Sequence, residues 1–376
     1  MHLYPKEKKC GAGALARVLA MNKRVFICAV FICVVITFEL GHTTADSPPT
    51  LRTAAEKRGV KIGAAVAPFH LNETQYASTL AAEFSQLEPE NAMKFGPIHP
   101  RSNTDHKPFD FASCDRLVKF AQEHKMAVRG HTLVWHQQDP KWLLEGGYSS
   151  TQLSNILKDH ITKVLSHFGN LMYAYDVVNE AFNDDGTMRS TIWYDKPGIG
   201  SAGHGTKYIG QALIWAHDAN PEAKLFYNDY DAELAGTPKS DAIYAMAKDF
   251  KKRAVPLDGI GLQMHVDLAF DQPAKLQALS ENIQRLGALG LEVHITELDV
   301  RLPSDDAASL KAQGHLYGEI IKACVQQPSC KAIQFWGVTD KYSWIPEYYK
   351  GMGWALPFDD QYQRKPAYRA ILDALR

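Results

Sequence analysis

Two glutamates, Glu180 and Glu297, each end a short apolar run of the sequence, YDVVNE (175–180) and VHITE (293–297). A carboxylate at the end of a buried strand is costly unless it is paired or functional. Hydrolysis of a glycosidic bond needs two carboxyl groups beside that bond. One is protonated near neutral pH and acts as an acid, and the other is ionised and acts as a nucleophile. The pair therefore indicates glycoside hydrolysis, with structural ion-paired carboxylates as the alternative.

The ends of other apolar runs carry amides, carboxylates, imidazoles and indoles. Such groups recognise sugars, because amides and carboxylates bond hydroxyl groups and aromatic faces stack on the apolar face of a pyranose. His265 and Asp299 are placed to support an ionised carboxylate. The polar positions, in chain order, are Glu90-Asn91, His131 to His136, Asn179-Glu180, Asn228 to Tyr230, Gln263 to His265, Glu297 to Asp299 and Trp336. Their residue types predict a carbohydrate site.

Eight short apolar runs position these residues, and stretches with helical spacing, such as 151–168, 207–219 and 310–325, lie between them. Alternation of this kind in one domain predicts an α/β protein with a single (β/α)₈ TIM barrel, whose chemistry lies at the carboxyl ends of the strands. Glu180 would then end the fourth strand and Glu297 the seventh. The predicted strands are Lys61–Ala67, Phe84–Leu87, Met126–Thr132, Met172–Val178, Lys224–Tyr227, Gly259–Met264, Leu291–Ile295 and Ala332–Phe335.

Residues 1–45 have the pattern of a secretory signal: six basic residues, an apolar run from Val25 to Phe38, and small residues ending at Ala45. Met21 is a second candidate start, which would give a signal of more ordinary length. An uncleaved signal anchor is the alternative, although the apolar run is short for a membrane span. We therefore expect a catalytic barrel at residues 46–376 that is secreted or periplasmic, without stable membrane association after cleavage.

The composition of the 376-residue chain is that of a globular protein, with 45% hydrophobic and 22% charged residues. The formal net charge of −1 gives no reason to expect a nucleic-acid partner, which would require a basic face. No Pro-, Ser- or Gly-rich linker interrupts residues 51–376. We expect one domain and a monomer.

Cysteines and histidines give further expectations. Cys324 and Cys330 enclose a short loop and are the plausible disulfide pair, which leaves Cys114 as a buried free thiol. His131 and His136 stand five residues apart with no acid at metal-ligand spacing, so no metal is expected. No phosphate-cradling Gly-rich loop follows a strand, so no nucleotide cofactor is implied.

Six segments, each at the end of a predicted strand and all in one order, resemble glycoside hydrolase family 10, the barrel xylanases. The resemblance covers essentially all of residues 51–376. The segments are EPENAMK (88–94), RGHTLVWH (129–136), DVVNEA (176–181), GLQMH (261–265), ITELD (295–299) and FWGVTD (335–340).

The resemblance implies a secreted endo-1,4-β-xylanase that binds xylan and xylo-oligosaccharides and retains anomeric configuration by double displacement, with no cofactor. It implies a role for each matched residue, and the spacing of Cys324 and Cys330 resembles a disulfide of many members. The implied roles are Glu180 as acid/base, Glu297 as nucleophile, Asn179 on the sugar 2-hydroxyl, His265 backed by Asp299 on Glu297, Gln263 beside the acid/base, His136 and Lys94 on the sugar being cleaved, Glu90 and Asn91 on the next sugar, Trp336 and Trp344 as an aromatic wall with Trp142 close by, and Asn228 and Tyr230 on the leaving-group side.

The chain departs from the family pattern at Phe95, Gln137 and Tyr175, where Trp, Ser and Trp are common. These departures affect subsite preference and leave the reaction unchanged. Two other functions remain open: a non-catalytic polysaccharide-binding barrel, which would have lost an acid, and a retaining cellulase or mixed-linkage glucanase with the same two acids. Hydrolysis of xylan compared with carboxymethylcellulose separates the two enzymes.

Overall fold

The structure is a computed structural model that describes residues 49–376. The predicted signal segment, residues 1–45, lies outside the described residues, as does the predicted domain start at residue 46.

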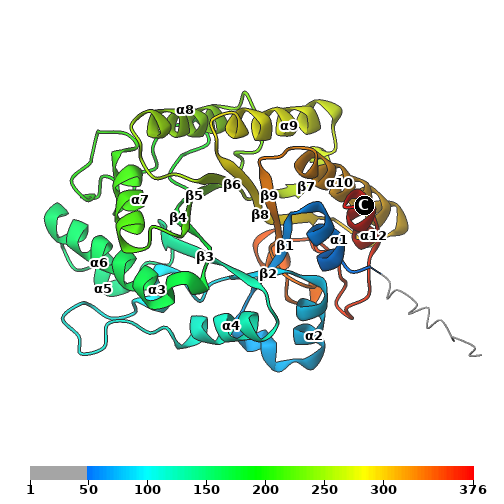
Figure 1. The fold of residues 1–376 in the computed structure, drawn as a ribbon, viewed down its shortest axis with the longest axis horizontal. Helices are drawn as coiled ribbons and strands as arrows, with labels where there is room; N and C mark the ends of the chain where they lie inside the picture. Colours follow the sequence, from blue (N-terminus) through cyan, green and yellow to red (C-terminus); the bar gives the residue numbers. More distant parts are fainter. Residues whose placement is uncertain (1–48) are drawn as a thin grey trace, which may run out of the picture. The chain divides into compact units, whose positions relative to one another are not determined.

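Eight parallel strands close into a barrel, and helices surround it (Figure 1). The ladder runs from β1 to β6, and the pairings β6–β8, β8–β9 and β9–β1 close it. The barrel strands are β1 (Lys61–Val66), β2 (Gln86–Pro89), β3 (Ala127–Val134), β4 (Ala174–Asn179), β5 (Lys224–Asp229), β6 (Gly259–Leu262), β8 (Glu292–Arg301) and β9 (Cys330–Phe335). Each predicted run overlaps one barrel strand, so the predicted α/β barrel is confirmed.

One strand differs from its prediction. Glu297 is expected to end the seventh strand, but β8 continues to Arg301. The reason is a short extra strand, β7 (His265–Asp267), which pairs in parallel with the last three residues of β8. This pairing sets His265 directly opposite Asp299.

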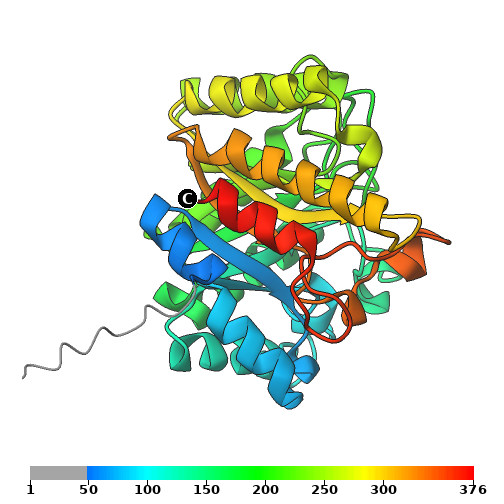
Figure 2. The ribbon, with the colours of Figure 1, turned by 90° about the vertical axis from the view of Figure 1, so that its right-hand side faces the viewer.

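The long helices follow the strands and pack around them. Figure 2 shows α12 lying along α10 and reaching α1, so the last helix covers the place where β1 and β9 close the barrel. The helices are α1 (Leu51–Arg58), α2 (Thr74–Glu83), α3 (Phe95–Ile98), α4 (Ala112–Glu123), α5 (Lys141–Leu144), α6 (Ser150–Phe168), α7 (Lys207–Ala219), α8 (Pro238–Lys252), α9 (Pro273–Gly287), α10 (Ala307–Val325), α11 (Ile345–Tyr348) and α12 (Pro366–Ala374), with 3-10 turns at η1 (Pro68–Asn72), η2 (Gly169–Leu171), η3 (Leu268–Phe270) and η4 (Asp340–Tyr342).

Local sequence explains where these helices begin. Ser149 and Gln152 form a capping box at the start of α6, and Asp306 accepts backbone N–H bonds from the first turn of α10. Proline occupies the first turn of α8, α9 and α12, where the missing N–H costs nothing. These signals determine where the crossover helices begin.

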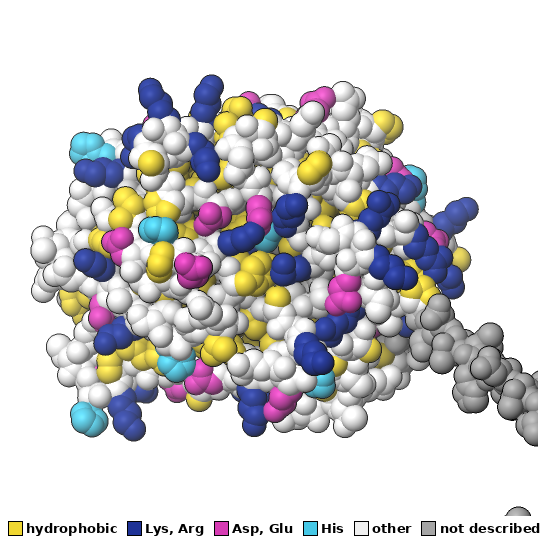
Figure 3. All heavy atoms as spheres, viewed as in Figure 1, with side chains coloured by type: hydrophobic (Ala, Val, Ile, Leu, Met, Phe, Trp, Pro, Cys, Tyr) yellow, Lys and Arg dark blue, Asp and Glu magenta, His cyan; other side chains and the backbone are white. Residues whose placement is uncertain are grey.

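The surface and the cysteines are those of an ordinary globular protein. On the face shown in Figure 3, basic and acidic side chains are interspersed and form no extended patch of one sign. Cys324 is bonded to Cys330, and Cys114 is free and buried, as predicted. Among residues 49–376, no helix is both long and apolar enough to cross a membrane.

A buried imidazole pair lies beneath α3. The ring of His160, on α6, stacks on Phe95 at a centroid distance of 3.9 Å and lies parallel to the ring of His99 at 5.6 Å. His160 is fully buried, and its two ring nitrogens have no hydrogen-bond partner among the described residues. Burial holds the pKa of His160 well below its ordinary value, with the neighbouring His99 as a second cause.

Replacing His160 by phenylalanine should therefore stabilise the protein selectively in acid. The pKa of this histidine has its ordinary value of 6.5 in the unfolded chain and a much lower value in the folded protein. As the pH falls below 6.5, only the unfolded chain takes up the proton, and the folded protein therefore loses stability. Between pH 7 and pH 5 that loss is about 2 kcal/mol, and the variant should lack it. Urea unfolding at the two pH values measures the difference. The same change at the exposed His106 is the matched control, and an equal response of His160→Phe at both pH values would contradict the account.

Candidate active site

A cleft of about 700 Å³ opens where the carboxyl ends of the strands meet. Both glutamates line it, which confirms that the barrel brings the fourth and seventh strands to one rim. The other predicted residues in its walls are Glu90, Asn91, Lys94, His136, Asn179, Gln263, His265, Tyr230, Trp336 and Trp344.

Glu297 lies in β8 with 4% of its surface exposed, and a chain of hydrogen bonds supports one of its oxygens. Its Oε2 lies 3.1 Å from Nε2 of His265, whose Nδ1 lies 2.9 Å from Oδ2 of Asp299. The indole of Trp344 donates to the same Asp299 oxygen at 2.8 Å. This chain is the support expected for an ionised nucleophile.

The electrostatics of this chain favour the ionised form of Glu297. Burial opposes ionisation, but the hydrogen bond from His265 and the nearby His131 outweigh it, and the pKa of Glu297 lies below its ordinary value. Burial likewise disfavours the imidazolium of His265, yet Asp299 and Glu297 raise the pKa of His265 to about 10. A protonated His265 between two carboxylates thus keeps Glu297 charged at neutral pH.

Glu180 directly follows β4, and its carboxylate accepts hydrogen bonds from neutral donors. The indole N–H of Trp135 donates to Oε2 at 2.8 Å, and Gln263 donates to Oε1 at 3.0 Å. Asn179 also donates to Oε1, at 3.2 Å. The donors around Glu180 are thus indole and amide groups, whereas Glu297 faces an imidazolium, so the two carboxylates occupy different environments.

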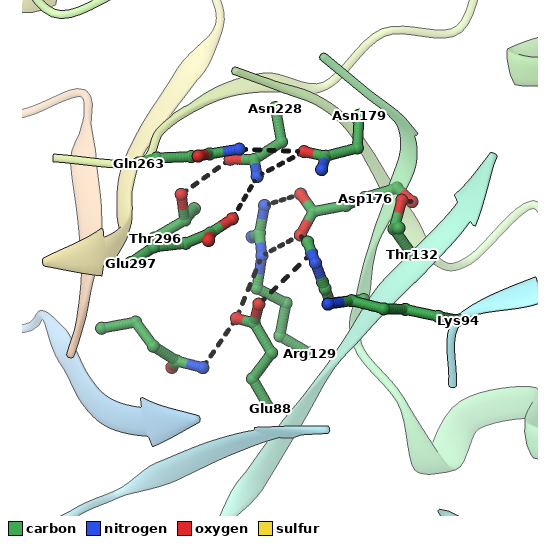
Figure 4. Close-up of polar contacts among 12 residues, drawn as sticks. Glu88, Lys94, Arg129, Thr132, Asp176, Asn179, Asn228, Gln263, Thr296 and Glu297 are labelled. Carbon is green, nitrogen blue, oxygen red and sulfur yellow. Dashed lines mark hydrogen bonds and ion pairs between the residues drawn. The ribbon is translucent and has the colours of Figure 1, made fainter. Parts of the chain in front are cut away.

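A bridge of amides joins the two carboxylates, and Figure 4 shows the part of it that links Gln263, Asn179 and Asn228 to Glu297. Asn228 donates from its single amide nitrogen to Oε1 of Glu297 at 2.7 Å and to Oδ1 of Asn179 at 2.9 Å. Gln263 also donates to that Asn179 oxygen, at 3.2 Å, as well as to Glu180. The relative positions of Glu180 and Glu297 are therefore fixed through shared partners.

Asn228 makes contacts that the sequence does not predict. The family resemblance implies a role for Asn228 on the leaving-group side, and in the structure its buried side chain donates to Glu297. Thr296 orients the amide by donating to Oδ1 at 2.6 Å. A Cβ at Gly261 would lie 2.1 Å from that oxygen, so the glycine makes room for the amide against β6.

A cluster of charged residues that includes Glu88, Arg129 and Asp176 lies near Glu297 (Figure 4). Arg129 is fully buried; its Nε donates to Asp176 at 3.1 Å and lies 3.7 Å from Glu88. His131 lies 3.0 Å from Asp176, and Gln334 donates to Glu88 at 2.6 Å. Glu88, His131 and Asp176 are metal-ligating types close enough to share one ion. The Arg129 guanidinium already supplies positive charge to this cluster, so the residues present do not fit a divalent cation.

One end of the cleft carries the residues predicted to bind the glycone, the sugars on the non-reducing side of the cleaved bond. Nζ of Lys94 donates to Asn91 at 2.8 Å, and Asn91 donates to Glu90 at 3.1 Å. The same ammonium lies 4.6 Å from the Trp135 ring centroid and 5.8 Å from that of Trp336. Charged, amide and aromatic groups therefore converge on one wall, as sugar binding requires.

Trp142 takes a different place from the other predicted tryptophans. It is absent from the cleft lining, and its indole N–H donates to the carbonyl of His99 at 3.1 Å. Its ring packs against His99 and Phe95, beneath the loop that carries His136. The reason is its position in α5, which turns the indole towards the buried aromatic stack.

Comparison with known proteins decides the family. Residues 50–374 match the model of glycosyl hydrolase family 10. The chain belongs to this family. It is 42% identical over 330 residues to endo-1,4-beta-xylanase B of Thermotoga neapolitana, covering 86% of this chain and 91% of that one.

Solved structures agree with the family assignment. Xylanase 10B of Thermotoga petrophila, determined with xylobiose, is 40% identical with a TM-score of 0.81, covering 88% of this chain and 98% of that one. Native xylanase 10B of Thermotoga maritima is 42% identical with a TM-score of 0.80, covering 87% and 98%.

Two residues of this family 10 site have no role in the sequence interpretation. Trp135 donates to Glu180, and Arg189 lines the cleft beside Tyr230. A signal for Trp135 exists, since a tryptophan among polar residues at a strand end needs a partner for its N–H. Arg189 lies nine positions after Glu180, in a loop where no spacing rule points to it.

The bond from Asn228 to Glu297 gives a direct test of the amide bridge. Asn228→Ala should lower kcat about 100-fold and leave KM nearly unchanged, because the variant loses orientation of the nucleophile rather than substrate contacts. The matched control is Asn282→Ala, which removes an equally buried amide on α9 outside the cleft. Steady-state kinetics of both variants measure the effect. A loss confined to KM, or an equal fall of kcat in the control, would contradict the bridge.

Proposed function

We propose that this family 10 glycoside hydrolase is a secreted endo-1,4-β-xylanase that cleaves internal bonds of xylan with retention of anomeric configuration. The observation that carries the proposal is the amide-bridged pair of carboxylates, of which Glu297 alone faces a cationic histidine. The names of the Thermotoga relatives support xylan as the substrate, since both are xylanases, whereas one relative that is 36% identical is named an exoglucanase.

In the proposed first step, Glu297 attacks the anomeric carbon while Glu180 donates a proton to the departing glycosidic oxygen. The leaving chain departs with a free hydroxyl group, and the sugar remains bonded to Glu297. In the second step Glu180 takes a proton from water, the water oxygen attacks the same carbon, and Glu297 departs as a carboxylate. Two inversions at one carbon give net retention.

The polar groups of the cleft support specific contacts. We expect Asn179 to bond the 2-hydroxyl of the sugar attached to Glu297, a contact that strengthens in the transition state. We expect Lys94 and His136 to bind the same sugar, and Glu90 and Asn91 to bind the next one. Xylose lacks the hydroxymethyl group of glucose, and we propose that Glu90, Lys94 and Trp344 leave no room for it.

Hydrolysis of xylan and of carboxymethylcellulose, followed by release of reducing ends, tests this function. We expect xylan to be cleaved at least about 100-fold faster, with mixed xylo-oligosaccharides appearing early, as for internal cleavage. Equal rates on the two polymers would indicate the glucanase. No release from either polymer would indicate the non-catalytic barrel.

Secretion, and the monomeric state, belong to the same proposal. The Cys324–Cys330 disulfide supports an oxidising compartment, and the pattern of residues 1–45 supports export. Sequencing the N-terminus of the protein from the culture medium tests this. A chain beginning near residue 46 is expected, whereas a longer chain in the membrane fraction would indicate a signal anchor.

A further inference from the structure

The backbone of Glu180 has an unfavourable conformation that its neighbours hold in place. Its φ of +57° lies in the left-handed region, which is costly for a residue with a side chain and tends to occur where the surroundings enforce it. Its N–H donates to the carbonyl of Asn228 at 2.9 Å, and the next N–H, of Ala181, donates to the hydroxyl of Tyr227 at 2.9 Å. The remaining polar group of the Glu180 backbone is its carbonyl oxygen.

That carbonyl is bonded to Arg189. Nε of Arg189 donates to the oxygen of Glu180 at 2.9 Å, and Nη2 donates to the oxygen of Phe182 at 3.1 Å. Nη2 also donates to the hydroxyl of Tyr230 at 2.9 Å, and Tyr230 lines the cleft. One guanidinium thus connects the backbone on both sides of Ala181 to a side chain of the cleft wall.

Tyr230 is itself held from below by Lys239, on α8. The Lys239 side chain is 1% exposed, and its Nζ lies 3.5 Å from the Tyr230 ring centroid and 3.2 Å from the Tyr230 carbonyl oxygen. The same nitrogen lies 2.7 Å from Asp184 and 3.6 Å from Asp229. Asp229 accepts hydrogen bonds from the N–H of Tyr230, at 3.0 Å, and from the hydroxyl of Tyr227. The Tyr227 hydroxyl is the group that accepts the N–H of Ala181, so Asp229 and Tyr227 connect Tyr230 to the residue after Glu180.

We propose that Arg189 is a positioning residue that aims the carboxyl group of Glu180 at the leaving oxygen. The inference rests on the proposed function, because it assumes that Glu180 protonates that oxygen. Glu297 lies on β8 and shares no contact with Arg189, so loss of the guanidinium should impair proton donation while nucleophilic attack continues. A shift of about 1 Å in a proton donor is enough to lower its rate strongly.

The dependence of rate on the leaving group tests this role. Aryl β-xylobiosides carry phenols that range from dinitrophenol, which leaves without protonation, to unsubstituted phenol, which requires it. For Arg189→Met, kcat/KM on the dinitrophenyl substrate should stay within about threefold of wild type, and on the phenyl substrate it should fall about 100-fold, the usual contribution of a general acid. Arg189→Lys, which keeps one donor, should give an intermediate fall.

Arg285→Met is the matched control, since it removes a partly buried guanidinium on α9 that lies outside the cleft lining and bonds Asp241 and Asn282. Its kcat/KM should follow the wild-type dependence on the leaving group. An equal fall of kcat/KM on all phenols in Arg189→Met would overturn the proposal. If Arg189→Met does not fold, Arg189→Lys provides the test. A dependence of kcat/KM on the leaving group equal to that of wild type in Arg189→Lys would overturn the proposal. A wild-type enzyme inactive on every xyloside would instead reject the proposed function.

Discussion

Glu297→Ala should abolish hydrolysis of xylan, with kcat lowered by at least about 10⁵-fold, because the variant has no group to form the bond to the anomeric carbon. Added azide should enter the space that the side chain leaves and attack an activated aryl β-xyloside from the same face. The product should be the α-glycosyl azide, whose configuration is inverted relative to the substrate.

The matched control for this variant is Glu292→Ala, at the opposite end of β8. Glu292 pairs with Lys224 and His294, outside the cleft lining, so the folded variant should keep near-wild-type kcat. NMR of the azide product and steady-state rates provide the measurement. A β-azide product from Glu297→Ala would show that another residue is the nucleophile.

Glu180→Ala should separate the two steps of the reaction. On xylan, kcat/KM should fall by about 10³ to 10⁴-fold, because a sugar hydroxyl is a poor leaving group without a proton donor. On a dinitrophenyl β-xylobioside the first step needs no acid, so kcat/KM should stay near wild type while kcat falls, since water now attacks the intermediate without a base. The two substrates thus report different steps.

Azide should restore kcat of Glu180→Ala on the dinitrophenyl substrate, because an anion attacks without base assistance. The product should be the β-glycosyl azide, the opposite anomer from that of Glu297→Ala. Unchanged kinetics on xylan, or failure of azide to raise kcat, would mean that Glu180 is not the acid/base.

The sequence suffices to predict the barrel and most of the cleft because both follow from one rule. Parallel strands buried on two faces read as apolar runs, and their carboxyl ends meet at one rim. Glu180, Gln263 and Trp336 can therefore be placed near one another without knowing any contact. Eight strands that alternate with helices in one domain favour a closed barrel over an open sheet, and a barrel brings all of these ends to one rim.

The direction in which individual side chains point could not be predicted from the sequence. The ladder between β4 and β5 shifts register between Asp176 and Val178, and this shift sets Asn228 opposite Asn179. No feature of either segment indicates this shift, so the bond from Asn228 to Glu297 could not be predicted. The extension of β8 to Arg301 likewise depends on pairing with β7, which is only three residues long.

The sequence also does not show which buried charges are paired with one another, because this depends on the direction of side chains. Asp229 is one of the polar residues at the strand ends that predict the carbohydrate site, yet it is fully buried. Its partners are Tyr227 on the same strand and Lys239 on the following helix. Burial raises the pKa of Asp229 to about 7 although Lys239 opposes the rise, an environment that the three-dimensional fold creates.

Proton NMR of the first products released from xylo-oligosaccharides by the wild-type enzyme tests the central claim most directly. Double displacement through Glu297 predicts that the new reducing end appears first as the β-anomer and reaches the anomeric mixture only by mutarotation. Release of the α-anomer first would mean that a water attacks directly, and the assignment of Glu297 as a nucleophile would be wrong.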